Sequence, residues 1–216
     1  MKNFLHNTKR AVLVTVVLMI ICGLIYPLVL TGISKVIFPR QAEGSLIRVD
    51  GKVVGAETIG QEFTEDYYMW GRPSAYHYNT YTEDENGNLV YSDGTEFAGV
   101  SSGSNNYAPT NEALTERVEN DMEKFLERNP EVKAEDIPTD LLTASGSGLD
   151  PHISPESAQI QIPRIAEASG LSEQKVEEIV SEHTEGKLLG VFGEETVNVL
   201  MVNLDIAKEM GVIPAE

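Results

Sequence analysis

The sequence predicts an α+β extracytoplasmic domain carried on a single N-terminal transmembrane helix. Residues 11–34 contain no Asp, Glu, Lys, Arg or His, which is typical of a membrane span. Residues 35–216 combine segments of helical and strand-like periodicity without a regular β-α-β alternation. This second part of the chain is also long enough to bury a core of its own. These three observations together define the predicted fold class.

The uncharged run at 11–34 predicts a retained membrane anchor. As a helix it would extend about 36 Å at 1.5 Å per residue, which suffices to cross a hydrocarbon layer of about 30 Å. The run is longer than the apolar core of a cleaved signal peptide, and Leu28–Ser34 lacks an Ala-x-Ala cleavage pattern. We expect Pro27 to kink this helix without ending it.

The charges on either side of the anchor predict its orientation. Lys2, Lys9 and Arg10 precede the span, and no acidic residue occurs before Glu43. Because Lys and Arg are enriched on the cytoplasmic side, residues 1–10 are expected inside and residues 35–216 outside. Lys35 and Arg40 on the far side reduce this charge difference. The chain is thus expected to be a single-pass protein of the cell membrane, in contact with membrane lipid.

Composition limits what the outer domain can bind. Residues 36–216 hold twelve basic residues against thirty-four acidic ones, a net charge of −22. Such a surface repels nucleic acid and concentrates cations, so no nucleic-acid partner is expected. The single cysteine, Cys22, lies inside the span. The outer domain therefore has no disulfide, no thiolate metal site and no cysteine nucleophile.

The first part of the outer domain carries turn signals. Asp50-Gly51 lies between strand-like runs at 46–49 and 52–54 and predicts a type I′ hairpin. An aromatic-rich stretch follows at 67–81. Residues 79–108 are predicted as a long loop that can hold a hairpin, with turns at Asn86-Gly87 and Asp93-Gly94.

Helices dominate the rest of the chain. Apolar residues at helical spacing over 111–128 predict an amphipathic helix, which the following Asn-Pro pair ends. A Ser-Pro pair at 154–155 predicts the start of a helix that Pro163 kinks or divides. Gly170 and Ser172 mark the passage to another helix.

The predicted boundaries nearer the C-terminus follow from the same signals. The helix after Ser172 is expected to run to Gly186. Strands are predicted over 187–192 and 197–201, where β-branched and aromatic residues are frequent. A short helix ending near Gly211 completes the chain.

The segment from Thr143 to His152 is the richest in reactive side chains. Ser, Asp and His all occur in it, so a membrane-tethered extracytoplasmic hydrolase that uses residues 145–152 is the alternative function. A nucleophile elbow needs Gly-x-Ser-x-Gly, whereas Ser145 and Leu149 stand two positions from Ser147. We favour the interpretation that the Ser and Asp side chains satisfy backbone groups in a glycine-rich loop. An anchored sensor with a ligand pocket is a third possibility.

Metal and nucleotide sites have weak sequence support. Asp150 and His152, with His183 and Glu185, could supply ligands, but their spacing is not that of a known metal site. A simpler role for His183 is to bind the carbonyls at a helix C-terminus. Leu188 stands where a phosphate loop requires Ser or Thr. No metal and no tightly bound cofactor is therefore expected.

The fifteen residues Leu141–Pro155, reading LLTASGSGLDPHISP, resemble the hallmark of the C subunit, or KdpC family, of the Kdp-type potassium-transporting P-type ATPase. The length, the single span and the order of further motifs agree with this resemblance, and those motifs include Arg72, His183, Glu185 and Asn198. Residues 81–100 are longer and more acidic than the corresponding link in that family.

The resemblance implies a non-catalytic subunit of a high-affinity, ATP-driven potassium import complex. Its implied partners are a channel-like potassium-translocating subunit, an ATP-hydrolysing P-type subunit and a small hydrophobic subunit. It further implies a role in assembly and as a catalytic chaperone that raises the ATP affinity of the hydrolysing subunit, with an outer domain that covers the channel-like subunit. ATP is thus implied for the complex.

Two site hypotheses follow from this resemblance and from the predicted topology. An outer domain cannot reach cytoplasmic ATP, so its effect on ATP affinity would be allosteric. The interaction or coupling loop would contain Ser145, Gly146, Ser147, Gly148, Asp150 and His152. Acidic side chains in the long loop would raise the local potassium concentration at the pore mouth, namely Glu83, Asp84, Glu85, Asp93 and Glu96.

Overall fold

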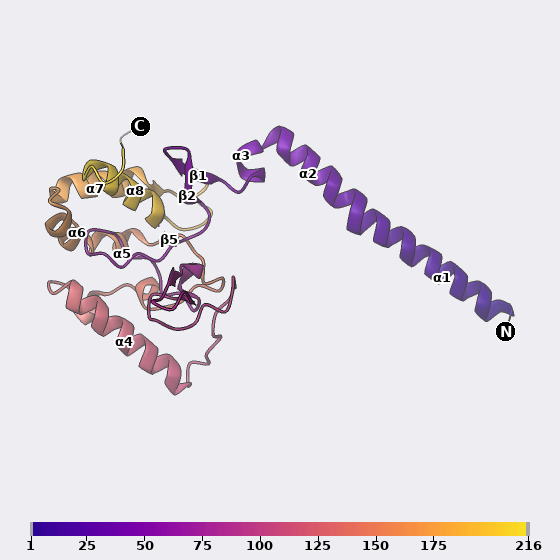
Figure 1. Ribbon diagram of the computed structural model, residues 1–216, viewed down its shortest axis with the longest axis horizontal. Coiled ribbons are helices and arrows are strands. Elements are labelled where there is room, and N and C mark those ends of the chain that lie inside the picture. The colour runs from indigo at the N-terminus through magenta and orange to yellow at the C-terminus, as the bar shows by residue number, and fades with distance from the viewer. Residues whose placement is uncertain (1, 215–216) are drawn as a thin grey trace. The chain divides into compact units, whose positions relative to one another are not determined.

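The computed structural model describes residues 2–214, and it contains two compact units that divide after Leu46. The first unit is a long helix (Figure 1). It comprises α1 (Lys2–Ile20), a π-helical turn (Ile21–Ile25), α2 (Tyr26–Ile37) and the short α3 (Pro39–Ala42). Its segment Phe4–Ile37 is long and apolar enough to cross a membrane.

The anchor helix continues through Pro27 rather than ending there. Proline lacks the N–H of an α-helical hydrogen bond, and its ring collides with the carbonyl four residues earlier. The π-helical turn Ile21–Ile25 lies at that point of the helix, so the irregularity caused by Pro27 takes the form of a local widening. The prediction that the helix passes through the proline is confirmed.

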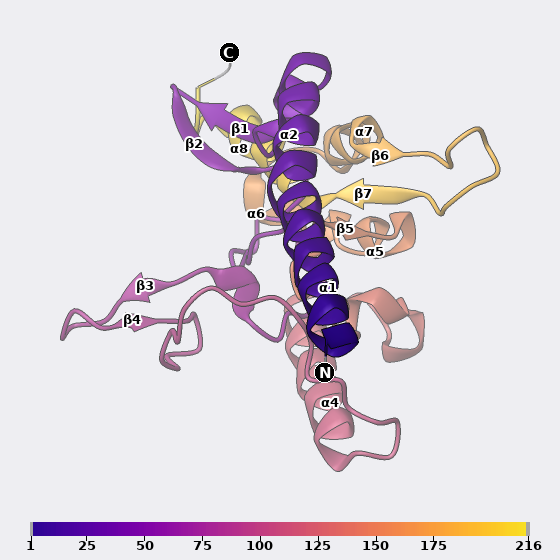
Figure 2. The ribbon, with the colours of Figure 1, turned by 90° about the vertical axis from the view of Figure 1, so that its right-hand side faces the viewer.

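The second unit, Ile47–Glu216, mixes small antiparallel sheets with helices, which confirms the α+β class. A first hairpin joins β1 (Leu46–Val49) to β2 (Lys52–Ala56), and a second joins β3 (Thr82–Glu83) to β4 (Leu89–Val90). A three-stranded sheet has the order β5-β7-β6, with β5 at His152–Ile153, β6 at Thr184–Glu185 and β7 at Thr196–Asn198. Figure 2 shows the β3–β4 hairpin and the β6–β7 connection extending from the body of this unit.

All three predicted turns occur where the sequence placed them, and Asp93-Gly94 reverses the chain between Tyr91 and Thr95. Asp50 and Gly51 have φ values of 50° and 73°, as a type I′ turn requires. Asn86-Gly87 turns the chain between β3 and β4, so the long loop at 79–108 does hold a hairpin.

Helices of the second unit begin at polar caps. They are α4 (Glu112–Arg128), α5 (Pro155–Gln159), α6 (Ile162–Ser169), α7 (Glu173–Glu182) and α8 (Val199–Glu209). At the start of four of these helices, the side-chain oxygen of a cap residue accepts a backbone N–H group of the first turn. These cap residues are Asn111, Ser154, Ser172 and Asn198. Pro163 lies in the first turn of α6, so the predicted division of the helix after residue 155 is confirmed.

The core of the second unit lies among α6, α7 and α8, and β7 contributes Val197. Residues 66–70, which we call the strap, pack against this core, and Met69 in the strap is fully buried. The amide of Asn203 on α8 accepts the Met69 N–H at 2.7 Å and donates to the Met69 carbonyl at 2.9 Å. Gln161 makes the same pair of bonds to Trp70. These bonds fix the position of the chain just before Arg72.

Three predicted boundaries near the C-terminus are wrong. Helix α7 ends at Glu182, four residues before Gly186, because Thr184 and Glu185 pair with β7 as strand β6. The predicted strand at 187–192 is a turn, in which Leu189 and Gly190 have φ values of 55° and 72°. Strand β7 ends at Asn198, because the Asn198 side chain caps α8 and the following residues are helical.

Candidate functional site

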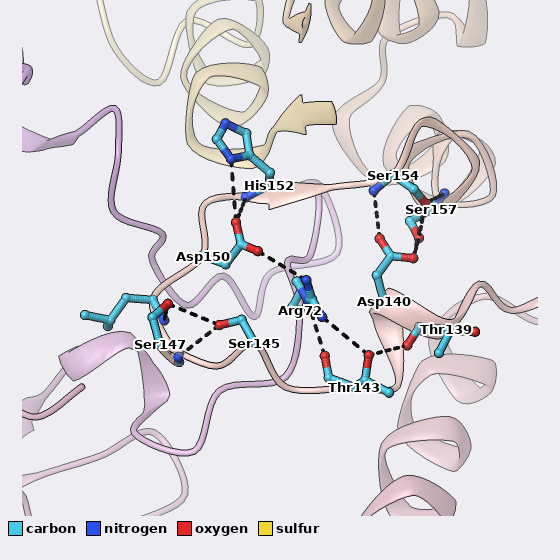
Figure 3. Close-up of polar contacts among 12 residues, drawn as sticks. Arg72, Thr139, Asp140, Thr143, Ser145, Ser147, Asp150, His152, Ser154 and Ser157 are labelled. Atoms are coloured by element: carbon cyan, nitrogen blue, oxygen red, sulfur yellow. Dashed lines mark hydrogen bonds and ion pairs between the residues drawn. The ribbon is translucent and has the colours of Figure 1, made fainter. Parts of the chain in front are cut away.

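The serine–glycine loop, Thr143–Pro151, leads into β5 and is built on local hydrogen bonds (Figure 3). The Ser145 hydroxyl oxygen accepts the Gly148 N–H at 2.9 Å, and that of Ser147 accepts the Leu149 N–H at 3.1 Å. The two hydroxyl oxygens lie 3.3 Å apart. Within the described residues neither of them bonds to the ring of His152, so this geometry supports the structural interpretation of the serines over the hydrolase alternative.

Three distant segments hold this loop in place. The Gly103 N–H donates to the Ser147 carbonyl at 2.7 Å, and the Ser74 hydroxyl donates to the Gly148 carbonyl at 2.7 Å. The Gly60 N–H donates to the Leu149 carbonyl at 2.9 Å. Since the loop's carbonyls are satisfied by chain segments far away in sequence, it joins the parts of the domain around residues 60, 74 and 103.

Arg72, Asp150 and His152 form the charged centre of the site. The Arg72 guanidinium lies 3.2 Å from Asp150 Oδ2 and also donates to the Thr143 carbonyl at 3.3 Å. Asp150 Oδ1 accepts the His152 N–H at 3.0 Å and lies 3.6 Å from the ring Nδ1. The His152 ring and backbone, with Arg72, hold the pKa of Asp150 below its ordinary value although partial burial opposes them.

Tyr78 supports this centre through a hydrogen bond to the backbone of Arg72. Its hydroxyl donates to the Arg72 carbonyl at 2.9 Å, and the residue is 9% exposed. Burial is the main cause that raises the pKa of Tyr78 well above its ordinary value, and the charge of Asp150 adds to it. The phenol therefore stays protonated and keeps its role as a donor to the backbone of Arg72.

A shallow pocket of about 630 Å³ opens over this centre, and Arg72, Ser145, Ser147, Asp150 and His152 line part of it. Its charged groups already pair with one another, and the Arg72 guanidinium is shared between Asp150 and Thr143. A phosphate group would have to compete with Asp150 for this guanidinium. The arrangement therefore offers an incoming anion no unpaired guanidinium.

The sheet β5-β7-β6 unites His152 with three other motif residues. His152 lies opposite Asn198 in the β5–β7 register, and Glu185 lies opposite Thr196 in the β6–β7 register. The Asn198 side chain donates to the Glu57 carbonyl at 2.8 Å, and its backbone N–H donates to the His183 carbonyl at 3.2 Å. Asn198 thus connects the strand that follows the serine–glycine loop to α8.

The side chain of His183 does not bind helix carbonyls as predicted. Its Nε2 lies 2.5 Å from Asp205 Oδ2 on α8, because the turn after α7 directs the ring toward that helix. Lys208 also contacts Asp205, at 2.8 Å. Although burial raises the pKa of Asp205, the hydrogen bonds from Lys208 and His183 lower it below its ordinary value.

The four residues considered as metal ligands do not come together. Asp150 and His152 lie at β5, whereas His183 and Glu185 lie at β6, and β7 runs between these two strands. Within the described residues, no group of three His, Cys, Asp or Glu side chains has a geometry that could hold a metal ion.

The five acidic residues of the steering hypothesis lie on or just after the β3–β4 hairpin. Asp84 accepts the N–H groups of Asn86 and Asn88, and Asp93 accepts that of Thr95. Side-chain hydrogen bonds from Asn88 and Thr95 are the main causes that lower the pKa of Asp84 and of Asp93. Both carboxylates therefore shape turns while they remain charged.

Sequence reasoning missed two residues that support the site. Asp140 accepts the Ser154 N–H at 2.7 Å and the Ser157 hydroxyl at 2.7 Å, so it fixes the start of α5 (Figure 3). Arg164 is buried, donates to the Tyr68 carbonyl at 3.0 Å and lies 4.7 Å from the ring of Trp70. The only local signal for Asp140 is its position beside the LLTASGSGLDPHISP block, and Arg164 has none.

Comparison with known proteins identifies the family. The model of a family described as KdpC, the c chain of K+-transporting ATPase, matches residues 8–208. A potassium-transporting ATPase KdpC subunit of Clostridium kluyveri is 59% identical over 211 residues, which cover 98% of each chain. One from Clostridioides difficile is 57% identical over 97% of this chain and 100% of the relative. The chain therefore belongs to the KdpC family and is an accessory, non-catalytic subunit of the Kdp potassium-transporting ATPase.

Proposed function

We propose that the folded domain of this subunit lies outside the cell membrane and covers the ion entrance of a channel-like subunit of the pump. There it helps the complex to assemble. Its partners in the complex are that channel-like subunit, the ATP-hydrolysing subunit and a small hydrophobic subunit. One observation carries this proposal: a single apolar helix separates a short N-terminus that contains Lys2, Lys9 and Arg10 from the whole folded domain.

The proposal includes an indirect effect on ATP binding. From outside the membrane, the domain raises the ATP affinity of the hydrolysing subunit by favouring one conformation of the membrane subunits. The chemistry of the serine–glycine loop supports an indirect route, since Arg72 is paired with Asp150 and the serine hydroxyls accept backbone N–H groups of the loop itself. The loop would therefore act as a contact surface and would not bind the nucleotide.

Accessibility to protease tests the orientation. Protease added to intact cells or right-side-out vesicles is expected to digest residues 35–216 and to leave the membrane-embedded helix. Inside-out vesicles should protect the domain until detergent is added. Digestion only in inside-out vesicles would refute the extracytoplasmic position and would favour direct contact with ATP.

A second experiment tests the indirect route. Purified pump is prepared with the full chain and with a chain that ends at residue 45, and the KM for ATP is measured at saturating potassium. We expect a several-fold higher KM without the domain, and a photoreactive ATP analogue should label the hydrolysing subunit alone. Labelling of this chain, with loss of the label when unmodified ATP is added, would contradict the proposal.

A further inference from the structure

The connection between β6 and β7 exposes an unusual amount of apolar surface. We call residues 187–193 the apolar hairpin. Its large side chains are the most exposed apolar groups in this part of the domain: Leu188 is 70% exposed, Leu189 83%, Val191 75% and Phe192 63%. Figure 2 shows this connection extending away from the helices, so it does not cover the core of the domain. Exposed apolar groups gathered in this way mark interaction sites.

The apolar hairpin has a defined conformation. Leu188 and Phe192 exchange backbone hydrogen bonds of 2.8 and 3.0 Å, and the Gly190 N–H donates to the Lys187 carbonyl at 2.9 Å. Leu189 occupies the left-handed region with a φ of 55°, where asparagine or glycine is favoured. Leucine at this position disfavours both the turn and the solubility of the domain, which indicates that its side chain serves another purpose.

The charges around the apolar hairpin favour a protein partner over a lipid surface. Lys187 pairs with Glu194 at 3.4 Å, and Glu185 and Glu195 add two further negative charges at the base. The domain as a whole carries a net charge of −22 and repels anionic headgroups. The surface complementary to this hairpin is an apolar recess with Lys or Arg side chains on its rim.

We propose that the apolar hairpin docks into an apolar, basic-rimmed recess on the outer surface of a membrane-embedded subunit of the same pump. This inference rests on the extracytoplasmic position proposed above. The hairpin leads directly into β7, which pairs with β5 through Asn198 and His152. Docking would therefore act on the strand that follows the serine–glycine loop, and it gives that loop a physical connection to the partner subunit.

A double substitution tests the docking without disturbing the fold. Leu189→Asn suits the left-handed backbone, and Val191→Thr keeps a β-branched side chain, so both substitutions retain the hairpin but remove apolar surface. The matched control is Val100→Thr, because Val100 is 83% exposed outside the apolar hairpin. The pump is captured through a tag on another subunit, and retention of each full-length variant is measured during dilution.

We expect the double variant to dissociate from the pump about tenfold more readily than the wild type or the control, as for loss of an interface anchor. Its thermal unfolding midpoint should equal or exceed that of the wild type. Retention equal to the wild type would overturn the docking proposal. A lowered unfolding midpoint would call for Leu189→Asn alone, which stabilises the turn, and unchanged retention of that variant would overturn the proposal as well.

A fluorescent label at the tip distinguishes the possible occupants. An environment-sensitive dye is attached to Leu189→Cys in a Cys22→Ala background, and the full chain is placed in vesicles with and without the other subunits. A blue shift that appears only in the assembled pump supports docking. A blue shift in vesicles of the chain alone would indicate lipid contact, and no shift in either sample would indicate a free loop. Both of these results overturn the proposal. The protease experiment above is independent of this label, so failure of the topology and failure of the docking are separable.

Discussion

Gly148 is the residue in the serine–glycine loop with the least freedom to change. Its φ is 65°, and an added Cβ would lie 2.6 Å from the Gly103 carbonyl oxygen, a backbone atom that cannot move alone. We expect Gly148→Ala to lower the free energy of unfolding by about 2 kcal/mol or more, from left-handed strain and this collision. Thermal unfolding of the detergent-solubilised chain measures the change.

Gly146 supplies the matched control for this prediction. It lies two residues away in the same loop, and an added Cβ would meet no atom within 4 Å. Gly146→Ala should therefore leave the unfolding midpoint nearly unchanged. If both substitutions destabilise the chain equally, the loop does not have the close contact with Gly103 that the structure describes.

The lowered pKa of Asp150 predicts a pH dependence. Since the folded-state pKa lies below the unfolded value, the ionised carboxylate adds stability above about pH 4, the ordinary Asp value. This stability is lost as the pH falls through the folded-state pKa. The wild type should exceed Asp150→Asn in unfolding free energy at pH 7, and the difference should shrink in acid. Urea unfolding between pH 7 and pH 3 tests this, and a constant difference would contradict it.

At the residue scale, the sequence identified the members of the site but not their partners. The serine–glycine loop was recognisable because its residues are contiguous, and its turn chemistry favoured backbone hydrogen bonds, as observed at Ser145 and Ser147. The contact between His183 and Asp205 joins residues on different elements. Such contacts depend on how helices pack, which local spacing does not determine.

Among the elements, α8 depends on the cap that joins it to the sheet. Asn198 accepts the Met201 N–H at 3.2 Å, donates to the Glu57 carbonyl at 2.8 Å and is 6% exposed. Asn198→Ala should cost about 2 kcal/mol of unfolding free energy, since it removes both the helix cap and the hydrogen bond to the Glu57 carbonyl. The control is Asn111→Ala, an exposed cap on α4 that should cost about 1 kcal/mol or less. Equal losses would mean that the Glu57 contact adds nothing.

Element boundaries were predictable where a single residue type decides them. The caps Ser154 and Ser172 start helices by bonding to the first free N–H groups, and local sequence shows them directly. The prediction of a strand at 187–192 was wrong because no single residue decides the conformation of this segment. Its apolar residues favour a strand in isolation, but the chain must reverse between β6 and β7, and the turn at Leu189 and Gly190 does this.

For the whole molecule, the apolar run and the fold class of the domain could be predicted from the sequence. The packing of distant segments within the domain could not. A long uncharged run needs no tertiary information to be recognised. The strap at 66–70, by contrast, is held by Asn203, Gln161 and Arg164, which follow it by ninety residues or more. No periodicity in the sequence connects such distant positions, although these bonds place Arg72 in the site.

The net charge of the whole domain leads to a prediction about potassium supply. Glu83, Glu85 and Glu96 lie on the β3–β4 hairpin and its flank, and the turns there are shaped by the carboxylates of Asp84 and Asp93 rather than by these glutamates. Changing these three glutamates to Gln removes negative charge without disturbing those turns. The apparent KM for potassium should rise about twofold or more at low ionic strength, and the effect should fade near 0.15 M salt, where charges are screened beyond about 8 Å.

A matched triple variant separates local steering from total charge in the same transport assay. Glu131, Glu167 and Glu173 are exposed on another part of the domain, and their change to Gln alters the net charge by the same amount. If the hairpin glutamates act at the pore mouth, only their removal raises the KM at low salt, because potentials decay within about one Debye length. An equal rise in both variants would assign the effect to the overall charge, and no rise in either would remove cation steering from the function of this domain.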